Sequence, residues 1–372
     1  MYKRHDRAGY IIVMTMLIIA AATVVVSVIF TRGSVFIPYA DTMIKREQAK
    51  MLALGGVSIA RAQLAQMPEE GDKSQGQAKE AGNKDGSDAE AKLLLKTILP
   101  SINRWQMFAL ASQNDGIDGQ IAICLTSEEG KFDLNKIRAE QQDQERVAKQ
   151  EGSTASTIKK EVLPLVSELF KRLEKELGAE GLLAGLEAYF KEHKEPITDV
   201  TELLRIPAFV VFRNAVVYEP PDMERGGQAQ QQKRPLYLTD IFTVHGSEEL
   251  EPWLFSDSIA GLLELPRAGL RDEKDRKKQV DTIIKEAKTK ANWASDWNKY
   301  LKPLYGKELQ SLPKNIESVL TTQFSPSIFS VISEGTVGGV TQRLLALVQR
   351  EQRTGDKNQR YYDVTIKKLY WL

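Results

Sequence analysis

The sequence predicts an α+β fold: a long N-terminal helix, transmembrane in its first half, carries an antiparallel sheet head with a large inserted α-helical domain. The first observation is an uncharged apolar run, Tyr10–Phe30, long enough to cross a hydrocarbon core of about 30 Å. The second is a helical period of apolar residues between about 160 and 300. The third is a period of two on either side, near 120–134 and from about 327 onwards.

Residues 1–9, MYKRHDRAG, form a basic leader that ends at Gly9, directly before the apolar run. Because positive charges stay on the cytoplasmic side, we expect the N-terminus in the cytoplasm and the bulk of the chain across the membrane. A secretory signal cut after Ala22 would leave an exposed apolar end, which counts against it. An uncleaved anchor is a second interpretation. The junction Gly9–Tyr10 also resembles a type IV prepilin leader, which would be cut between these two residues.

The apolar segment 10–31 continues into an amphipathic helix over 32–66, with a kink expected at Pro38. Small residues recur there at three- and four-residue spacing, opposite charged ones. We expect this half of the helix to pack on the head. We also expect its small side chains to let helices of other subunits approach closely. The small residues are Ala49, Ala53, Gly55, Gly56 and Ala60. A coiled-coil stalk is the alternative, although no apolar heptad persists for three repeats.

Composition divides the remaining chain. The expected parts are a flexible linker over 67–90, the first part of the head over 91–159, the inserted helical domain over 160–300 and the closing strands of the head over 301–372. The first part of the head is expected to contain a helix over 91–110, a β-hairpin near 120–134 and a polar stretch over 138–160. The second arm of the hairpin, KFDLNKI, is expected to be a strand or a strand-to-helix corner. In the helical domain, Asp199 and Glu202 have the spacing of a capping box.

Composition and motifs argue against several classes of function. The chain has 51 basic and 50 acidic side chains, so no global field favours nucleic acid. The single cysteine, Cys124, lies in the apolar run IAICL and reads as a buried small hydrophobe. The histidines His5, His193 and His245 stand in unrelated contexts, and no common catalytic or P-loop spacing is present. We therefore expect no enzyme.

Several segments, in order along nearly the whole chain, resemble one family. They are the leader and helix RAGYIIVMTMLIIAAATVVV, Trp105 followed by ICLTSEEGKFDLNKI, ITDVTELLRI, TDIFTVHG and SIFSVISEGTVGGVTQRLLALVQR. Together they resemble the minor pseudopilin K family of type II secretion, the general secretion pathway protein K, and would make the chain a divergent member. Asp133 departs from the family pattern, which has asparagine more often. An aspartate-rich D-W-x-D segment of the family is also absent between 170 and 196.

The resemblance implies a pilin-like fold and a place at the tip of a secretion pseudopilus, which starts or caps its assembly. Met14 stands at the fifth position after the expected cut, where most pilins carry a glutamate that compensates the N-terminal ammonium of a neighbour. A subunit with nothing above it has no need of that carboxylate, because the cost of a buried unpaired charge arises only where a neighbour is stacked on it. The implied partners are other minor pseudopilins and the prepilin peptidase, and the resemblance also implies N-methylation of Tyr10. The implied location is the inner membrane, with the head in the periplasm.

Two alternatives stay open. One is a single-pass inner-membrane envelope protein whose periplasmic helical domain binds a partner. The other is a minor pilin of a related type IV filament.

Calcium is the only cofactor that the sequence brings into question. The loop NDGIDG offers Asp115 and Asp118, and the resemblance implies that calcium can be held in the head. The loop lacks EF-hand spacing and the bidentate glutamate of that motif, so a simple turn is the alternative.

Overall fold

The computed structural model describes residues 6–65, 96, 98–149, 162–219, 235–246, 250–265, 278, 280–282, 297–308, 311–313, 316, 320, 326–354 and 360–372. Several sequence-based expectations lie outside this part of the chain. They are the 67–90 linker, the first five residues of the leader and most of the helical segment expected over 278–301.

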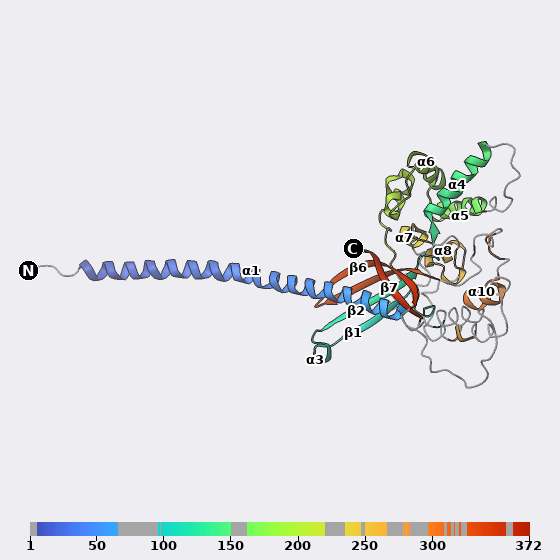
Figure 1. Ribbon diagram of the computed structural model, residues 1–372. Helices are drawn as coiled ribbons and strands as arrows, with labels where there is room; N and C mark the ends of the chain where they lie inside the picture. Colours follow the sequence, from blue (N-terminus) through green and yellow to red (C-terminus); the bar gives the residue numbers. More distant parts are fainter. Residues whose placement is uncertain are drawn as a thin grey trace, which may run out of the picture.

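Helix α1, Asp6–Ala65, is a single helix of 60 residues that continues through Pro38. Figure 1 shows its first half standing away from the rest of the molecule as a rod, with the N-terminus at the far end. The segment from Tyr10 has a mean hydropathy of 2.8 over its most apolar window, and that window has no buried part. By length and composition it can cross a membrane, a property that an N-terminal signal sequence shares.

The head contains a five-stranded antiparallel sheet with the strand order β1-β2-β5-β6-β7. Its strands are β1 (Trp105–Leu110), β2 (Gly119–Ser127), β5 (Ile328–Val337), β6 (Val340–Thr354) and β7 (Arg360–Trp371). The second half of α1 lies along this sheet (Figure 1). The fold therefore has the predicted long apolar helix and antiparallel sheet, and the predicted pairing of the closing strands with the strand near 120 is confirmed.

The segments between β2 and β5 are mainly helical. They include α4 (Leu134–Lys149), α5 (Val162–Leu177), α6 (Leu182–Glu192), η2 (Val200–Arg205), η3 (Pro207–Phe212), α7 (Leu238–Ile241), η5 (Pro252–Leu254), α8 (Asp257–Leu262) and α10 (Trp297–Tyr305). The predicted capping box is present, because Asp199 accepts from the backbone of Thr201 and Glu202 accepts from that of Asp199. Two short parallel strands, β3 (Phe132–Asp133) and β4 (Phe242–Thr243), join the start of this region to its middle.

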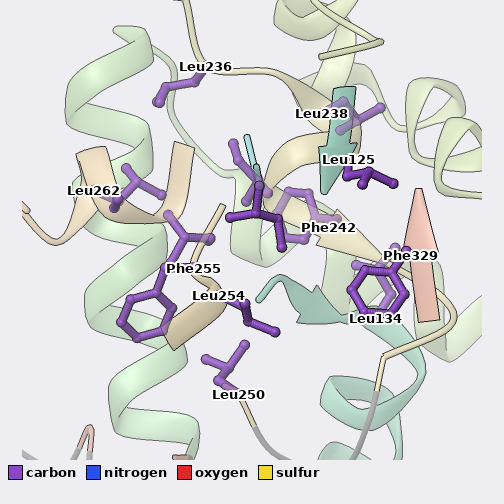
Figure 2. Close-up of a cluster of buried hydrophobic side chains, with 14 of the residues drawn as sticks. Leu125, Leu134, Leu236, Leu238, Phe242, Leu250, Leu254, Phe255, Leu262 and Phe329 are labelled. Atoms are coloured by element: carbon purple, nitrogen blue, oxygen red, sulfur yellow. The ribbon is translucent and has the colours of Figure 1, made fainter. Parts of the chain in front are cut away.

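One apolar core connects the sheet to the helices. Figure 2 shows Leu125 of β2 and Phe329 of β5 gathered with Phe242 of β4, Leu134 of α4 and Leu254 of η5. All five side chains are at most 1% exposed. Because they come from segments more than two hundred residues apart in sequence, the helical region and the sheet stabilise each other.

Two sequence-based expectations are wrong. The helix expected over 91–110 is replaced by turns at 98–104 and by strand β1. The hairpin expected near 120–134 does not form, because β2 pairs with β1 and β5 while β3 pairs with β4. The alternative for its second arm, a strand-to-helix corner, is confirmed, because β3 ends at Asp133 and α4 begins at Leu134. The polar stretch that begins at 138 is helical as far as Lys149, as part of α4.

Candidate functional site

The apolar half of α1 is the most exposed apolar surface in the part of the chain that the structure describes. Tyr10 is 66% exposed and Met14 is 45% exposed, and both lie within the helix. Gly9, the expected last residue of the leader, is helical as well. From Tyr10 to Tyr39 the sequence holds no acidic residue, and Arg32 is its single charged side chain. A rod of this kind needs either lipid or other apolar helices around it.

The small residues in the second half of α1 face the sheet of the same chain. Ala49, Ala53 and Ala60 are fully buried, and Gly56 is buried beside them. A Cβ atom on Gly56 would lie 2.9 Å from the side chains of Ile121 and Ile123 and would overlap Ser333. The expectation that these four residues face the helices of other subunits is therefore corrected, because they let α1 approach its own sheet.

The opposite side of α1 carries an exposed stripe of apolar and small side chains. Ile44, Met51 and Ser58 recur every seven residues, and Ala62 follows four residues later. Ile44 is 58% exposed and Met51 is 69% exposed. Residues seven positions apart are two helical turns apart, so these side chains form one line along α1. The stripe is thus an exposed surface on the side of α1 that does not face the sheet.

The face of the sheet away from α1 rests on a buried polar turn between β2 and β3. Glu128 and Lys131 form an ion pair of 2.5 Å, with side chains that are 6% and 3% exposed. Thr243 donates to Glu128 at 2.5 Å, and Ser330 donates to it as well. Burial alone would raise the pKa of Glu128, but Lys131 and these hydrogen bonds outweigh it and hold that pKa below its usual value.

Glu129 fastens the same turn to the closing strands. One carboxylate oxygen accepts from the backbone N–H groups of Ser327 (2.8 Å) and Ile328 (2.9 Å) and from the Ser327 hydroxyl (2.9 Å). The other accepts from Ser127 at 2.7 Å. Gly130 has no room for a side chain, because a Cβ would overlap the carbonyl of Leu254. The turn is therefore a fixed joint between the sheet and the helical region.

A buried carboxyl pair lies near this turn. Asp240 is fully buried and accepts from the backbone N–H of Ser258 at 2.7 Å, while Tyr218 donates to Asp257 at 2.7 Å. Burial and the neighbouring Asp257 raise the pKa of Asp240 to about 6. Burial also raises the pKa of Cys124, whose side chain is fully buried as expected from the sequence.

A cavity of about 230 Å³ separates the ends of β6 and β7 from the start of η2 and from β4. Two hydrogen bonds cross this gap: Lys368 donates to the carbonyl of Thr198 at 2.7 Å, and Tyr370 donates to Asp199 at 3.1 Å. Burial, with Lys368 as the next cause, lowers the pKa of His245 on the cavity wall. The charged groups here are used to join β7 to the helical region, and they assemble no catalytic arrangement among the described residues.

The two acidic residues of the loop NDGIDG accept hydrogen bonds from the backbone of the same loop. Asp115 accepts from the backbone N–H of Ala111 at 3.0 Å, and Asp118 accepts from that of Ser112 at 2.7 Å. Calcium takes six to eight oxygen ligands. No group of three or more metal-ligating side chains exists among the described residues. The two carboxylates therefore act as caps of the short helix α3, Ser112–Asp115.

Sequence reasoning missed the polar joint at 127–131. The segment SEEGK has the composition of a turn, and two adjacent glutamates in a turn usually face water. The available signal was their position between the apolar strand IAICL and the apolar KFDLNKI, which leaves little room for solvent.

Comparison with known proteins gives little support for assigning the chain to a family. No protein-family model and no curated protein matches this sequence. Among solved structures, the chain is similar to one in the crystal structure of the GspK-GspI-GspJ complex from the enterotoxigenic Escherichia coli type 2 secretion system. The similarity covers 76% of this chain and 93% of that chain, at 13% identity and a TM-score of 0.37. Values this low do not establish a family, so the function is argued from the residues of this chain.

Proposed function

We propose that this protein is a minor pseudopilin at the tip of a type II secretion pseudopilus, where it starts or caps assembly and has no enzymatic role. The observation that carries the proposal is the form of α1. Its first half is apolar and exposed all round, and its second half is held along an antiparallel sheet by small buried residues. Such a helix can pass from a bilayer into a bundle of similar helices while the head stays attached.

The identity of the residue at position 14, a methionine, supports a location at the tip of the pseudopilus. After a cut between Gly9 and Tyr10, the new N-terminal ammonium would enter the apolar environment and would need a carboxylate nearby. This chain offers no acidic residue to a subunit above it until Asp41. We propose the inner membrane as its location, with the head in the periplasm, and processing and N-methylation of Tyr10 by the prepilin peptidase.

The exposed stripe of α1 is the proposed contact with other minor pseudopilins. Met51 lies at its centre and is 69% exposed, so replacing it changes the stripe without disturbing the core. Val211 of η3 is 42% exposed and lies in the helical region, away from α1, which makes it a matched control.

The test is complementation in the native host. Deletion of the gene should abolish pseudopilus assembly and secretion. Wild type and Val211→Glu should restore both, whereas Met51→Glu should restore neither, although it accumulates in the membrane. Met14→Glu should insert normally and give no gain in assembly. If deletion leaves assembly and secretion intact, the tip role is wrong, and a partner-binding envelope protein becomes the better interpretation. If secretion is intact but another type IV filament is lost, the chain is a minor pilin of that system.

A further inference from the structure

The edge strand β7 carries an apolar strip that no described segment covers. Ile366, Leu369 and Trp371 are 41%, 39% and 46% exposed. Monomeric proteins rarely expose large side chains in a row on an edge strand, since a bare apolar edge invites association. Trp371, at the end of the strand, also borders the cavity on the other side of the sheet.

A β-bulge places this strip on the face of the sheet that holds α1. Val348 pairs with Ile366, but Leu347 pairs with Lys368, so Lys367 is the extra residue. After the bulge, Leu369 pairs with Ala346 and Trp371 with Leu344. Leu344, Ala346 and Val348 are fully buried and alternate in step with Arg350, which donates to the carbonyl of Leu64 on α1. Without the bulge, Lys368 and Tyr370 would occupy this face instead.

The spacing of the sheet fits a second helix over β7. Helix α1 lies over β5, because a Cβ on Gly335 would be 2.6 Å from the backbone nitrogen of Ala53. Strand β7 is two positions from β5, a distance of about 10 Å at the usual strand spacing. Packed helices have axes about 8–10 Å apart. A helix that lies beside α1 therefore lies on the strip.

The opposite side of α1 offers a less exposed surface on the sheet. Strand β1 is also two positions from β5, but Gln106 and Phe108 on its α1 face are half-buried. Gln63 of α1 donates to Gln106 at 2.8 Å, which closes that side. On the β7 side, Arg61 of α1 donates to the carbonyl of Val364, and Leu54, seven residues earlier on the same side of the helix, is 37% exposed. Leu54 thus continues the apolar surface from α1 towards β7.

We propose that Leu54, Ile366, Leu369 and Trp371 form the docking site for the stem helix of a second pilin-like subunit, which lies parallel to α1. The inference rests on the proposed function, because a partner anchored in the same membrane is what makes the two stems parallel. Its chemistry follows from the strip, which favours an apolar, largely uncharged helical face. The α1 face of strand β7 would then determine which neighbouring subunit binds.

The experiment is site-specific photo-crosslinking of the full chain in the membranes of the native host, with mass spectrometry of the joined peptides. A photo-reactive residue at Leu369 should join to a peptide from the N-terminal helix of another pilin-like subunit, just after its apolar segment. The control is Met107 of β1, which is 49% exposed on the opposite edge and opposite face of the sheet and should give no such peptide. With the probe at Leu54, Leu369→Arg should lower the crosslinking yield at least tenfold, and Met107→Arg should leave it unchanged.

Crosslinks from Leu369 to lipid, to the head of a partner or to no protein would overturn the inference, as would an equal yield from Met107. Leu369→Ala serves as a milder variant if Leu369→Arg does not accumulate, and its yield should fall in the same direction. A probe at Met51 separates this inference from the proposed function. If Met51 joins to a pilin-like stem and Leu369 does not, the docking site is wrong and the function stands. If neither joins to one, both are wrong.

Discussion

The two faces of the five-stranded sheet are held in different ways. On one face, α1 packs mainly through Ala49, Ala53, Gly56 and Ala60, and Arg61 and Arg350 add hydrogen bonds to backbone carbonyls. On the other face, the helical region is attached through the buried ion pair of Glu128 and Lys131, through hydrogen-bonded carboxylates and around a cavity of about 230 Å³. Close packing holds the stem against the sheet. Polar contacts hold the helical region in its orientation, so the stability of that attachment depends on the charges of the groups involved.

The largest expected effect lies on the polar face. Glu128→Leu removes one partner of a buried ion pair and leaves the Lys131 ammonium unpaired, with both side chains at most 6% exposed. Loss of one partner of such a pair costs about 3–5 kcal/mol. Urea unfolding of the full chain in detergent, followed by tryptophan fluorescence, measures this. Glu128→Leu combined with Lys131→Met should recover much of the loss. A single variant as stable as the wild type would show that the pair does not hold the joint.

The next effect lies on the α1 face and compares two neighbouring glycines. Gly56→Ala places a Cβ 2.9 Å from Ile121 and Ile123 and should lower the free energy of unfolding by about 1–3 kcal/mol. Gly55→Ala places a Cβ 3.8 Å from Ile121, an ordinary contact, and should raise that free energy by up to about 1 kcal/mol through helix propensity. The same unfolding assay measures both. Equal effects from the two variants would contradict the close seating of α1.

Asp240 gives the polar face a pH dependence. Burial and Asp257 raise its folded pKa to about 6 from the ordinary 3.8, while Lys131 acts in the opposite direction. Since the folded state holds the proton more tightly, its stabilising contribution is present below pH 3.8 and is lost as the pH rises through about 6. Asp240→Asn should therefore stabilise the chain at pH 8 by up to about 3 kcal/mol, at about 1.4 kcal/mol for each of about two pKa units, and have little effect at pH 4. Unfolding curves at both pH values measure this, and a variant that is destabilised at pH 8 would contradict it.

The smallest effect concerns the loop between β1 and β2. Asp118→Ala removes the carboxylate that accepts from Ser112 and should cost about 1 kcal/mol. Millimolar calcium should leave the thermal midpoint of the wild type unchanged. A calcium-dependent rise that Asp118→Ala abolishes would instead establish a metal site there.

The sequence predicts the stem and the closing strands well because both follow local patterns. The apolar run from Tyr10 and the period of two after 327 are visible without tertiary information. Helix α4 was missed because it is largely polar, although Glu, Gln, Lys, Arg and Ala favour helices by propensity. The pairing of Phe132 with Phe242 was missed because it joins residues 110 positions apart in the sequence.

The site was predicted only in part for a related reason. The spacing of Ala49, Ala53, Gly56 and Ala60 shows that something approaches α1 closely, but it does not show whether that neighbour is a helix or a sheet. The structure assigns these residues to the sheet and leaves the stripe with Met51 exposed. The bulge at Lys367, which turns Leu369 towards α1, depends on strand register and has no counterpart in the sequence pattern.

The central claim is that α1 is a processed pilin-type stem, and the most direct test is the intact mass of the protein extracted from the membranes of its native host. The account predicts a chain that begins at Tyr10 and carries one N-terminal methyl group, and Gly9→Leu should block this cut. A mass that retains Met1, or one that corresponds to a cut after Ala22, would contradict it.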